Sequence, residues 1–413
     1  MKKYLMTIFT GILLILSSNS FAKEDCGECH EEITVSASHE SIACIECHEP
    51  EGDHYVPAAD FKNGAKGCLK CHEEYTGMLE SPMHTRDKEK HYVKNVFEQY
   101  DPDFFEKNCE GCHVNSCIDC HDDNNNAHKI TKPETSVCLK CHNDYFIGAD
   151  YTGLGIREDH ERYQRGIKVA EQYHQAMLPD VHYEKGMDCG ECHSMESLAS
   201  GKKSSKVCND CHIPDKNILE HSIDAHLQKM ACSTCHAAWA PVEYGTFWIK
   251  FEGNARKDYF KWIKSPSEDY SKSSYKRYNR RPHIGVNEKG IYVPIRPMFI
   301  NVFSLIRNQS AMLENKVLSY DYKVFVPHTI RRETRLCATC HENKEAFLIY
   351  DNASRIFMPE KDGMPFKSFK DGEKANIFGG RVVTPEEYKL INGLYLDNKT
   401  LQIKKWNDLL NVF

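Results

Sequence analysis

After its first 22 residues the chain lacks a long apolar run, and it also lacks an excess of positive charge. No later stretch is apolar over the roughly eighteen residues that a spanning helix needs, so we expect no transmembrane segment in the mature chain. The 53 Lys and Arg residues are outnumbered by 60 Asp and Glu residues. This balance disfavours nucleic acid as a partner, because binding to phosphates requires a positive surface.

The apolar run that does exist stands at the N-terminus. Lys2 and Lys3 precede a run from Tyr4 to Leu16, and Ser20, Phe21 and Ala22 then offer the small residues of a cleavage site. This pattern predicts a secretory signal peptide over residues 1–22, which leaves about 391 residues of the 413. No cysteine follows Ala22, so lipid attachment there is not expected.

No cysteine is left outside one pattern. All 20 fall into ten copies of C-x-x-C-H, which contain the pairs Cys26/Cys29, Cys44/Cys47, Cys68/Cys71, Cys109/Cys112, Cys117/Cys120, Cys138/Cys141, Cys189/Cys192, Cys208/Cys211, Cys232/Cys235 and Cys337/Cys340. The histidines that follow them are His30, His48, His72, His113, His121, His142, His193, His212, His236 and His341.

This spacing suits haem c. Two thiols three positions apart can form thioethers with the two vinyl groups of one haem, and the adjacent histidine can bind its iron from below. A disulfide framework predicts irregular spacings instead. Zinc sites and redox dithiols use C-x-x-C pairs, but neither requires a histidine after all ten second cysteines.

At these positions the chain resembles the multihaem cytochromes c of bacteria, as in C-G-E-C-H at 26–30 and C-S-T-C-H at 232–236. The resemblance rests on fifty motif residues between 26 and 341. It implies ten covalently attached haems c, added after export, and a redox function.

The second iron ligands are sought among the other histidines. Ten of the 22 histidines belong to motifs, and the remaining twelve are His39, His54, His84, His91, His128, His160, His174, His182, His221, His226, His283 and His328. Twelve candidates for ten irons favour bis-histidine ligation at most sites, with about two non-ligands. Such ligation gives low potentials, because a methionine ligand raises them.

Local spacing narrows these candidates. Residues 157–178 look helical up to Pro179, and a helix would place His160 and His174 on nearly one face about 21 Å apart, too far to share a haem. His84 and His91 would also share a helical face. His221 and His226, five residues apart, would point in different directions.

Motif density predicts the fold class and the domains. Nine motifs lie within the 211 residues of 26–236, too many for an ordinary apolar core. We therefore expect a mainly α, largely irregular, haem-cored chain of short helices and loops, folding as haem is attached.

A nine-haem region would span 23–236, with duplicated trihaem units at 26–72 and 189–236 that both open with C-G-E-C-H. Residues 237–413 would hold an aromatic and basic insert, the tenth site and a helical C-terminal cover, whose helix begins at Thr384-Pro385-Glu386-Glu387.

The same crowding favours an electron relay. A compact body of about 391 residues has a radius of gyration of about 21 Å, which puts neighbouring haems at most about 20 Å apart. The alternative is a multihaem reductase or oxidase of a small nitrogen, sulfur or selenium compound at one open haem. A weaker similarity to the octahaem hydroxylamine oxidoreductases and tetrathionate reductases implies this, and the basic run Lys272, Lys276, Arg277, Arg280 and Arg281 would attract an anion.

Export and redox function together suggest where the protein works. The expected partners are other cytochromes, a quinol-oxidising membrane complex or an outer-membrane conduit, with self-assembly as a further option. The expected location is the periplasm or the outer surface.

Overall fold

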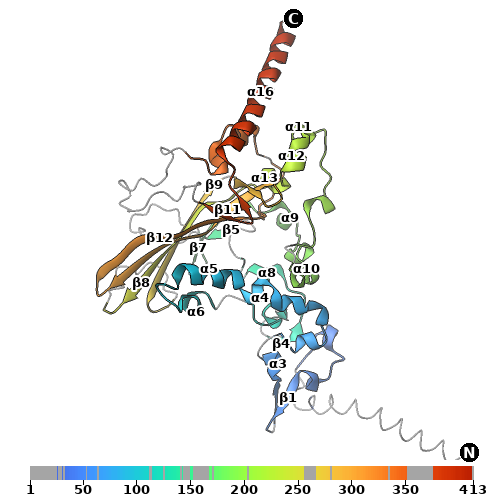
Figure 1. Cartoon of the computed structure of the whole chain (residues 1–413). Coiled ribbons are helices and arrows are strands. Elements are labelled where there is room, and N and C mark those ends of the chain that lie inside the picture. The colour runs from blue at the N-terminus through green and yellow to red at the C-terminus, as the bar shows by residue number, and fades with distance from the viewer. Residues whose placement is uncertain are drawn as a thin grey trace, which may run out of the picture. The chain divides into compact units, whose positions relative to one another are not determined.

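The computed structural model describes two compact units, which are treated separately below (Figure 1). The described residues are 26, 30, 33–52, 54–62, 65–110, 114–123, 126–139, 142, 149–151, 167–169, 172–201, 204–254, 267–279, 281–333, 335–350 and 375–411. The predicted signal peptide lies outside them, as do Cys29, Cys112, His113, Cys141 and His160, and of His174 only the backbone is described.

Unit 1 comprises residues 1–93, 109–141 and 188–207. Most of its elements are single turns joined by irregular segments. Its helices and 3-10 turns are η1 (Ala37–His39), η2 (Cys44–Glu46), α3 (Ala59–Lys62), η3 (Cys68–Lys70), η4 (Glu73–Glu80), α4 (Pro82–Thr85), α5 (Asp87–Phe97, whose last turn belongs to unit 2), α7 (Ile118–His121), α8 (Thr135–Leu139), η7 (Cys189–Glu191) and α10 (Met195–Ala199). Two short hairpins pair β1 (His48–Glu51) with β2 (His54–Pro57) and β3 (Asp122–Asp123) with β4 (Asn126–Ile130).

The motifs that the structure describes in full fold as one turn. In the third motif, for example, the Cys71 and His72 amides both donate to the Cys68 carbonyl, at 3.2 and 3.1 Å. Because residues three and four apart share one side of a helical turn, this conformation brings both cysteines and the histidine together. The spacing of the motif is thus sufficient to fix its local structure.

Unit 2 comprises residues 94–108, 142–187 and 208–413. Its helices are α6 (Phe104–Asn108), α9 (Val181–Glu184), η8 (Cys208–Asp210), α11 (Leu219–Ser222), α12 (Asp224–Lys229), α13 (Cys232–His236), α14 (Cys337–His341), η10 (Lys344–Phe347) and α16 (Pro385–Leu410). Its strands are β5 (Ala149–Tyr151), β6 (Ile167–Val169), β7 (Gln172–Ala176), β8 (Ala240–Glu252), β9 (Tyr270–Asn279), β10 (His283–Asn287), β11 (Tyr292–Arg307), β12 (Ser310–Val324), β13 (Asn376–Phe378) and β14 (Gly380–Arg381).

A seven-stranded mixed sheet dominates the described part of unit 2. Its path runs β13-β12-β11-β10-β14, and β8 lies between β11 and β9. The expectation of a mainly α chain is therefore wrong for the insert, although the short helices and irregular segments are confirmed elsewhere. Without haem sites of its own, this segment must bury its aromatic and β-branched side chains against each other, and those residues favour strands.

The long β11–β12 ribbon is closed by a tight turn. Asn308 and Gln309 both have positive φ, 48° and 68°, as a type I′ hairpin requires. Along β11 the register with β12 shifts between Pro297 and Ile300. Proline lacks the amide that a ladder needs, so a bulge at this point is expected.

The sheet also anchors the tenth motif. Ile284 and Val286 of β10 form a buried cluster with Cys340, Phe347 and Val383. One cysteine of the tenth motif is therefore part of an ordinary hydrophobic core.

Helix α16 begins as predicted. The Glu387 amide donates to Thr384 Oγ1 at 3.2 Å, and the Thr384 amide donates to Glu387 Oε2 at 2.9 Å, which is a capping box with Pro385 at the first helical position. In Figure 1 the last turns of this helix project from the unit. Within the part of the chain that the structure describes, no helix combines the length and apolarity needed to cross a membrane.

Two local predictions are wrong. Residues 167–169 and 172–176 are the strands β6 and β7 rather than helix, so the spacing argument for His160 and His174 does not hold. These strands alternate and contain β-branched and aromatic residues, features that favour strands. His84 and His91 do not share a helix either, because Arg86 adopts a left-handed conformation (φ 59°) that ends α4 before α5 begins at Asp87.

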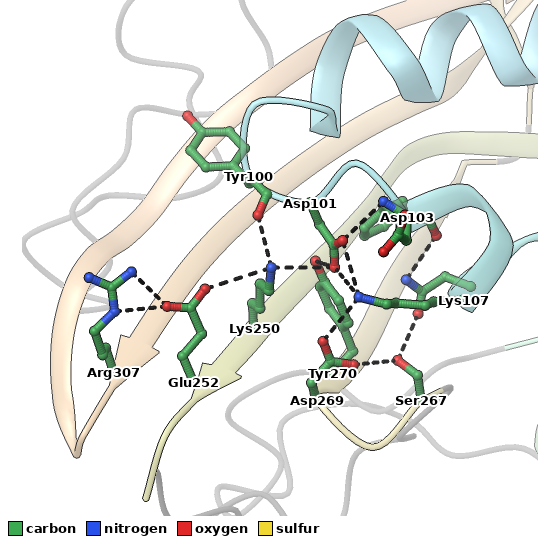
Figure 2. A network of polar contacts seen from close by, with 12 residues as sticks. Tyr100, Asp101, Asp103, Lys107, Lys250, Glu252, Ser267, Asp269, Tyr270 and Arg307 are labelled. Carbon is green, nitrogen blue, oxygen red and sulfur yellow. Dashed lines mark hydrogen bonds and ion pairs between the residues drawn. The ribbon is translucent and has the colours of Figure 1, made fainter.

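An aromatic cluster joins the segment around α6 to the sheet within unit 2. The rings of Phe97 and Phe104 stack at 3.8 Å, and Phe104 meets Trp248 and Tyr270 edge-on at 4.8 and 5.3 Å. Beside them lies Asp101, of which 2% is exposed (Figure 2).

The Asp101 carboxylate is held by groups from three segments. It accepts hydrogen bonds from Lys107 at 3.0 and 3.1 Å and from the Tyr270 hydroxyl at 3.0 Å, and Lys250 Nζ lies 3.4 Å away. Burial raises the pKa of Asp101, but these hydrogen bonds and the Lys250 charge outweigh it and hold the pKa below its usual value. The same surroundings raise the pKa of Tyr270.

We predict that Asp101→Asn lowers the free energy of unfolding by about 3 kcal/mol, because the lysines lose their buried counter-charge. Since the folded-state pKa lies below the unfolded value of about 3.9, the stabilisation is present above that pH and is lost as pH falls through the folded-state pKa. Urea unfolding of the holoprotein at pH 7, and again at pH 3 and pH 2 where the loss is expected, followed by circular dichroism, measures both effects. Glu98→Gln, which removes an exposed charge near Lys94, is the matched control, and an equal loss in the two variants would contradict the prediction.

Candidate functional site

The structure brings motif histidines together with other histidines. We number the motifs and their sites 1 to 10 in chain order. In five cases a motif histidine faces one histidine from outside the motifs. The pairs, with their ring-centroid distances, are His48–His128 at 5.8 Å (site 2), His72–His39 at 6.2 Å (site 3), His212–His182 at 5.9 Å (site 8), His236–His221 at 6.1 Å (site 9) and His341–His226 at 6.1 Å (site 10).

These distances fit two imidazoles on opposite sides of one metal ion. A metal–imidazole bond is about 2 Å long, and the ring centre lies about 1 Å beyond the nitrogen, so two such ligands have centroids about 6 Å apart. Groups of three or more His, Cys, Asp or Glu side chains suited to a metal ion are absent from the described residues. The arrangement at these five sites fits a pair of axial ligands.

Hydrogen bonds orient several of the candidate ligand rings, inside and outside the five pairs. The Nδ1 atoms of His236 and His341 donate to the carbonyls of Arg331 and Ile391, at 3.1 and 2.9 Å. His121 donates in the same way to Thr131 at 2.9 Å, and His84 to Val114 at 3.0 Å. Engaging Nδ1 fixes the tautomer and leaves Nε2 as the nitrogen that can bind a metal, as is usual for metal-ligating histidines.

His182 differs in the kind of acceptor. Its Nδ1 donates to a carboxylate oxygen of Asp180 at 2.9 Å. Asp180 is the N-cap of α9 and accepts the His182 amide as well, also at 2.9 Å.

Three more of the paired histidines have surroundings that fit metal binding. His221 Nδ1 is buried and has no hydrogen-bond partner in the structure. Burial lowers the pKa of His226, and the nearby His341 adds to this. Burial and the nearby His128 and His30 likewise lower the pKa of His48. Both rings are thereby kept neutral, the form that binds metals.

Cysteines of different motifs lie close together and show which sites are neighbours in unit 1. The thiols of Cys68 (site 3) and Cys117 (site 5) are hydrogen-bonded, which lowers the pKa of Cys68 to about 6. Cys138 of site 6 interacts with Cys189 of site 7 and also with Cys120 of site 5. The charges of Cys68 and Cys71 reach Cys47 of site 2. Sites 2, 3, 5, 6 and 7 therefore form a continuous series.

A second series lies within unit 2. A hydrogen bond joins the thiols of Cys208 (site 8) and Cys232 (site 9). Cys235 of site 9 interacts with Cys340 of site 10, and burial, the largest cause, raises the pKa of Cys235 to about 11. Sites 8, 9 and 10 are thus consecutive neighbours.

The second cysteines of motifs 7 and 8 complete the one-turn structures of those sites. The Cys192 and Cys211 amides donate to the Cys189 and Cys208 carbonyls, at 3.2 and 3.3 Å. Cys192 is half-buried and its carbonyl accepts the Ser205 amide at 2.8 Å, whereas Cys211 is exposed rather than enclosed by protein. Motifs 7 and 8 therefore form the same turn as motif 3. The thioether role of Cys192 and Cys211 stays a prediction, as it does for every motif cysteine.

The other described motif cysteines are partly or fully accessible. They are Cys26, Cys44, Cys109 and Cys337, of which the first three are half-buried and the last is exposed. Within the described residues no cysteine belongs to a disulfide.

The start of α16 holds the histidine of site 10. Tyr388 Oη and Asn392 Nδ2 both donate to the His341 carbonyl, at 3.1 and 2.6 Å, while Tyr395 stacks on the imidazole at 4.9 Å. The first three turns of the helix therefore cover this site.

The remaining candidates are placed as follows. His54 is exposed on β2, His91 is exposed on α5, and His328 is exposed after β12. His283 is buried on β10, and its Nε2 lies 3.3 Å from the Tyr350 hydroxyl. His221 and His226 face different motif histidines, as their spacing predicted.

The basic run gives no support to an anion site where it is described. Lys272 Nζ lies 4.9 Å from the Trp248 ring centre. Arg281 donates to the backbone carbonyls of Cys235, Ala237 and Glu333, at 3.3, 2.8 and 3.4 Å. The side chains of Lys276, Arg277 and Arg280 lie outside the description.

Sequence reasoning missed two charged residues at these sites, Asp180 and Arg335. Asp180 had a visible signal, because an aspartate two residues before a histidine can cap a turn and reach its ring. Arg335, of which 6% is exposed, precedes the tenth motif by two residues. Its contact with the ninth site depends on the tertiary fold, so no local sequence pattern predicts it.

Comparison with known proteins gives one distant relationship. The chain is 23% identical over 194 residues to the multiheme cytochrome MtrA of Shewanella baltica (strain OS185), and the match covers 42% of this chain and 53% of that protein. The chain thus spans about half the length of this relative. No protein-family model and no solved structure matches it. At this distance the chain is similar to a multihaem cytochrome, the class that its ten motifs indicate.

Proposed function

We propose that the protein is an exported decahaem c-type cytochrome that relays electrons through closely spaced, mostly bis-histidine haems. The observation that carries this proposal is the set of five imidazole pairs, each of which combines one motif histidine with one other histidine about 6 Å away. The distant similarity to a multiheme cytochrome supports it.

The residues then have distinct roles. The 20 motif cysteines hold the haems as thioethers, the ten motif histidines are the proximal ligands, and His128, His39, His182, His221 and His226 are the distal ligands of sites 2, 3, 8, 9 and 10. When bound, haem iron supplies a one-electron couple whose potential depends on its ligands and the surrounding charge.

We extend this assignment to two further histidines. His84 is the proposed distal ligand of site 4, because its Nδ1 donates to Val114, the residue directly after that motif, and its Nε2 is left for a metal. His283 is proposed as a non-ligand, because its Nε2 faces the Tyr350 hydroxyl inside the sheet.

Contact between neighbouring motifs supports a relay. Electron tunnelling falls steeply with distance, and the cysteines of sites 2, 3, 5, 6 and 7, and those of sites 8, 9 and 10, lie in two series of direct neighbours. A protein that converts one substrate needs no such series.

The proposed setting follows from the predicted signal peptide over residues 1–22. The protein would work in the periplasm or at the outer surface, between donors and acceptors such as other cytochromes, a quinol-oxidising membrane complex or an outer-membrane conduit. Subcellular fractionation with a protease-accessibility assay distinguishes the two locations.

We predict that the intact mass of the mature holoprotein equals the chain from about Lys23 plus ten haems, because every motif is complete. The ferric protein should show no stoichiometric high-spin haem by electron paramagnetic resonance. One high-spin iron per molecule would favour the reductase alternative, and eight haems or disulfides would contradict the motif assignment.

We predict that His226→Ala converts one haem in ten to a high-spin form, because His341 loses its partner. His226→Met should instead keep that iron low-spin and raise its potential, since thioether ligation favours the ferrous form. His283→Gln is the matched control and should leave all ten low-spin. A high-spin signal in the control, or none in His226→Ala, would contradict the ligand assignment.

We predict two kinds of low-spin signal in the ferric resonance spectrum. The ring planes at site 2 are 3° apart, whereas those at site 3 are 67° apart. The relative orientation of axial imidazole planes sets the splitting of the iron d orbitals, so parallel planes give a rhombic signal and crossed planes a much more anisotropic one. His128→Ala should remove part of the rhombic signal and His39→Ala part of the anisotropic one, and a reversed pattern would contradict the pairing.

A further inference from the structure

Charges of opposite sign lie beside different sites of unit 2: Asp180 and Arg335 are buried and Arg281 is half-buried. Asp180 contacts the proposed distal ligand of site 8, and Arg281 and Arg335 lie between sites 9 and 10. The inference drawn below from these charges rests on the proposed haem ligation.

The negative charge is fixed at the His182 imidazole. Asp180 Oδ1 accepts both the His182 amide and its ring Nδ1, at 2.9 Å each, and Oδ2 accepts the Ile330 amide at 2.7 Å. The Asp180 side chain is 10% exposed, so solvent screens it little. These three bonds prevent the carboxylate from turning away from the ring.

Arg331, the residue after Ile330, is engaged with other groups. Arg331 Nη1 donates to Glu184 Oε2 at 2.7 Å and to the Pro179 carbonyl at 3.1 Å. Asp180 therefore shares its charge chiefly with His182. A carboxylate that accepts from a ligand imidazole makes the ring a stronger donor to the metal, which favours the ferric state.

The positive charges, unlike Asp180, contact backbone carbonyls instead of a ligand imidazole. Arg335 donates to the carbonyls of Thr234 and Pro282, and Arg281 donates to those of Cys235 and Ala237. These acceptors are neutral, and the Glu333 charge raises the pKa of Arg281. Burial and the neighbouring Arg335 charge lower the pKa of Arg281, so the two guanidinium groups lie close together.

Both arginines act on the two adjoining sites. Arg335 donates to the Thr234 carbonyl inside the ninth motif and lies two residues before Cys337 of the tenth. Arg281 donates to the Cys235 carbonyl, next to His236. The motif histidines there, His236 and His341, donate to neutral carbonyls rather than to a carboxylate. A buried positive charge favours the ferrous state, because reduction removes one positive charge from the iron.

We propose that unit 2 is electrostatically graded: Asp180 makes site 8 its low-potential haem, and Arg281 and Arg335 raise the potentials of sites 9 and 10. Because sites 8, 9 and 10 are consecutive neighbours, an electron arriving at site 8 moves toward higher potential at site 10, the site that α16 covers. Asp180 and the two arginines are positioning residues in this scheme, since they act through the ligand and through the field.

Asp180→Asn tests the negative end. Asparagine keeps the size and one acceptor but removes the charge, so one haem should rise in potential by about a tenfold shift in its redox equilibrium, or about 59 mV for one electron. The measurement is a redox titration of the holoprotein followed optically and by electron paramagnetic resonance. Glu184→Gln is the matched control, because it removes a nearby carboxylate on the same helix that does not touch His182, and it should shift that haem much less.

Arg281→Gln tests the positive end and keeps the proposal falsifiable if Asp180→Asn folds poorly. One or two haems should fall in potential. In the redox titration, the first electrons added should then be shared more evenly among the haems and also occupy site 8. Equal shifts in Asp180→Asn and Glu184→Gln, or a rise in Arg281→Gln, would overturn the gradient.

Those results would leave the relay intact if all variants still carry ten low-spin haems. Missing haems in the unsubstituted protein would instead overturn the proposed function itself.

Discussion

Under the proposed ligation, the constraint on which the described structure depends is that two imidazoles must meet across one metal ion. Each pair joins segments that are distant in sequence: His48 and His128 are 80 residues apart, and His226 and His341 are 115 apart. Closing such loops costs conformational entropy, and in unit 1, built of single turns with few buried apolar residues, metal–ligand bonds are the proposed compensation. Folding and cofactor attachment are then one process, as in other metal-dependent domains.

Unit 2 adds a second source of stability. Its sheet buries Phe247, Ile295, Ile300, Val302 and Tyr322 in a core of the ordinary kind, and Cys340 belongs to an adjoining cluster with β10. The tenth site is thus held between a rigid sheet and the capped start of α16. A site supported by packed elements keeps its geometry better than one supported by loops, which suits an end point of an electron path.

Buried charge is used in two ways within the same unit. Asp101 meets two lysines and a tyrosine, so its charge is compensated and serves to fasten the segment around α6 to the sheet. Asp180 meets backbone amides and a single imidazole, so its charge remains available to the metal site. The difference lies in the partners rather than in burial, because both carboxylates are almost inaccessible to water.

The sequence by itself determined the chemistry of the sites. The C-x-x-C-H spacing indicates haem attachment, and Thr384-Pro385-Glu386-Glu387 predicts a helix start, because each depends on residues within about five positions of one another. The count of histidines over the whole chain favours bis-histidine ligation. The trihaem duplication remains a prediction. Only the tertiary structure decided that the insert is a sheet, which histidine meets which motif, and that Asp180 and Arg335 lie at the proposed haem sites. Those features depend on contacts between residues up to about a hundred positions apart, and a local pattern carries no information about such contacts.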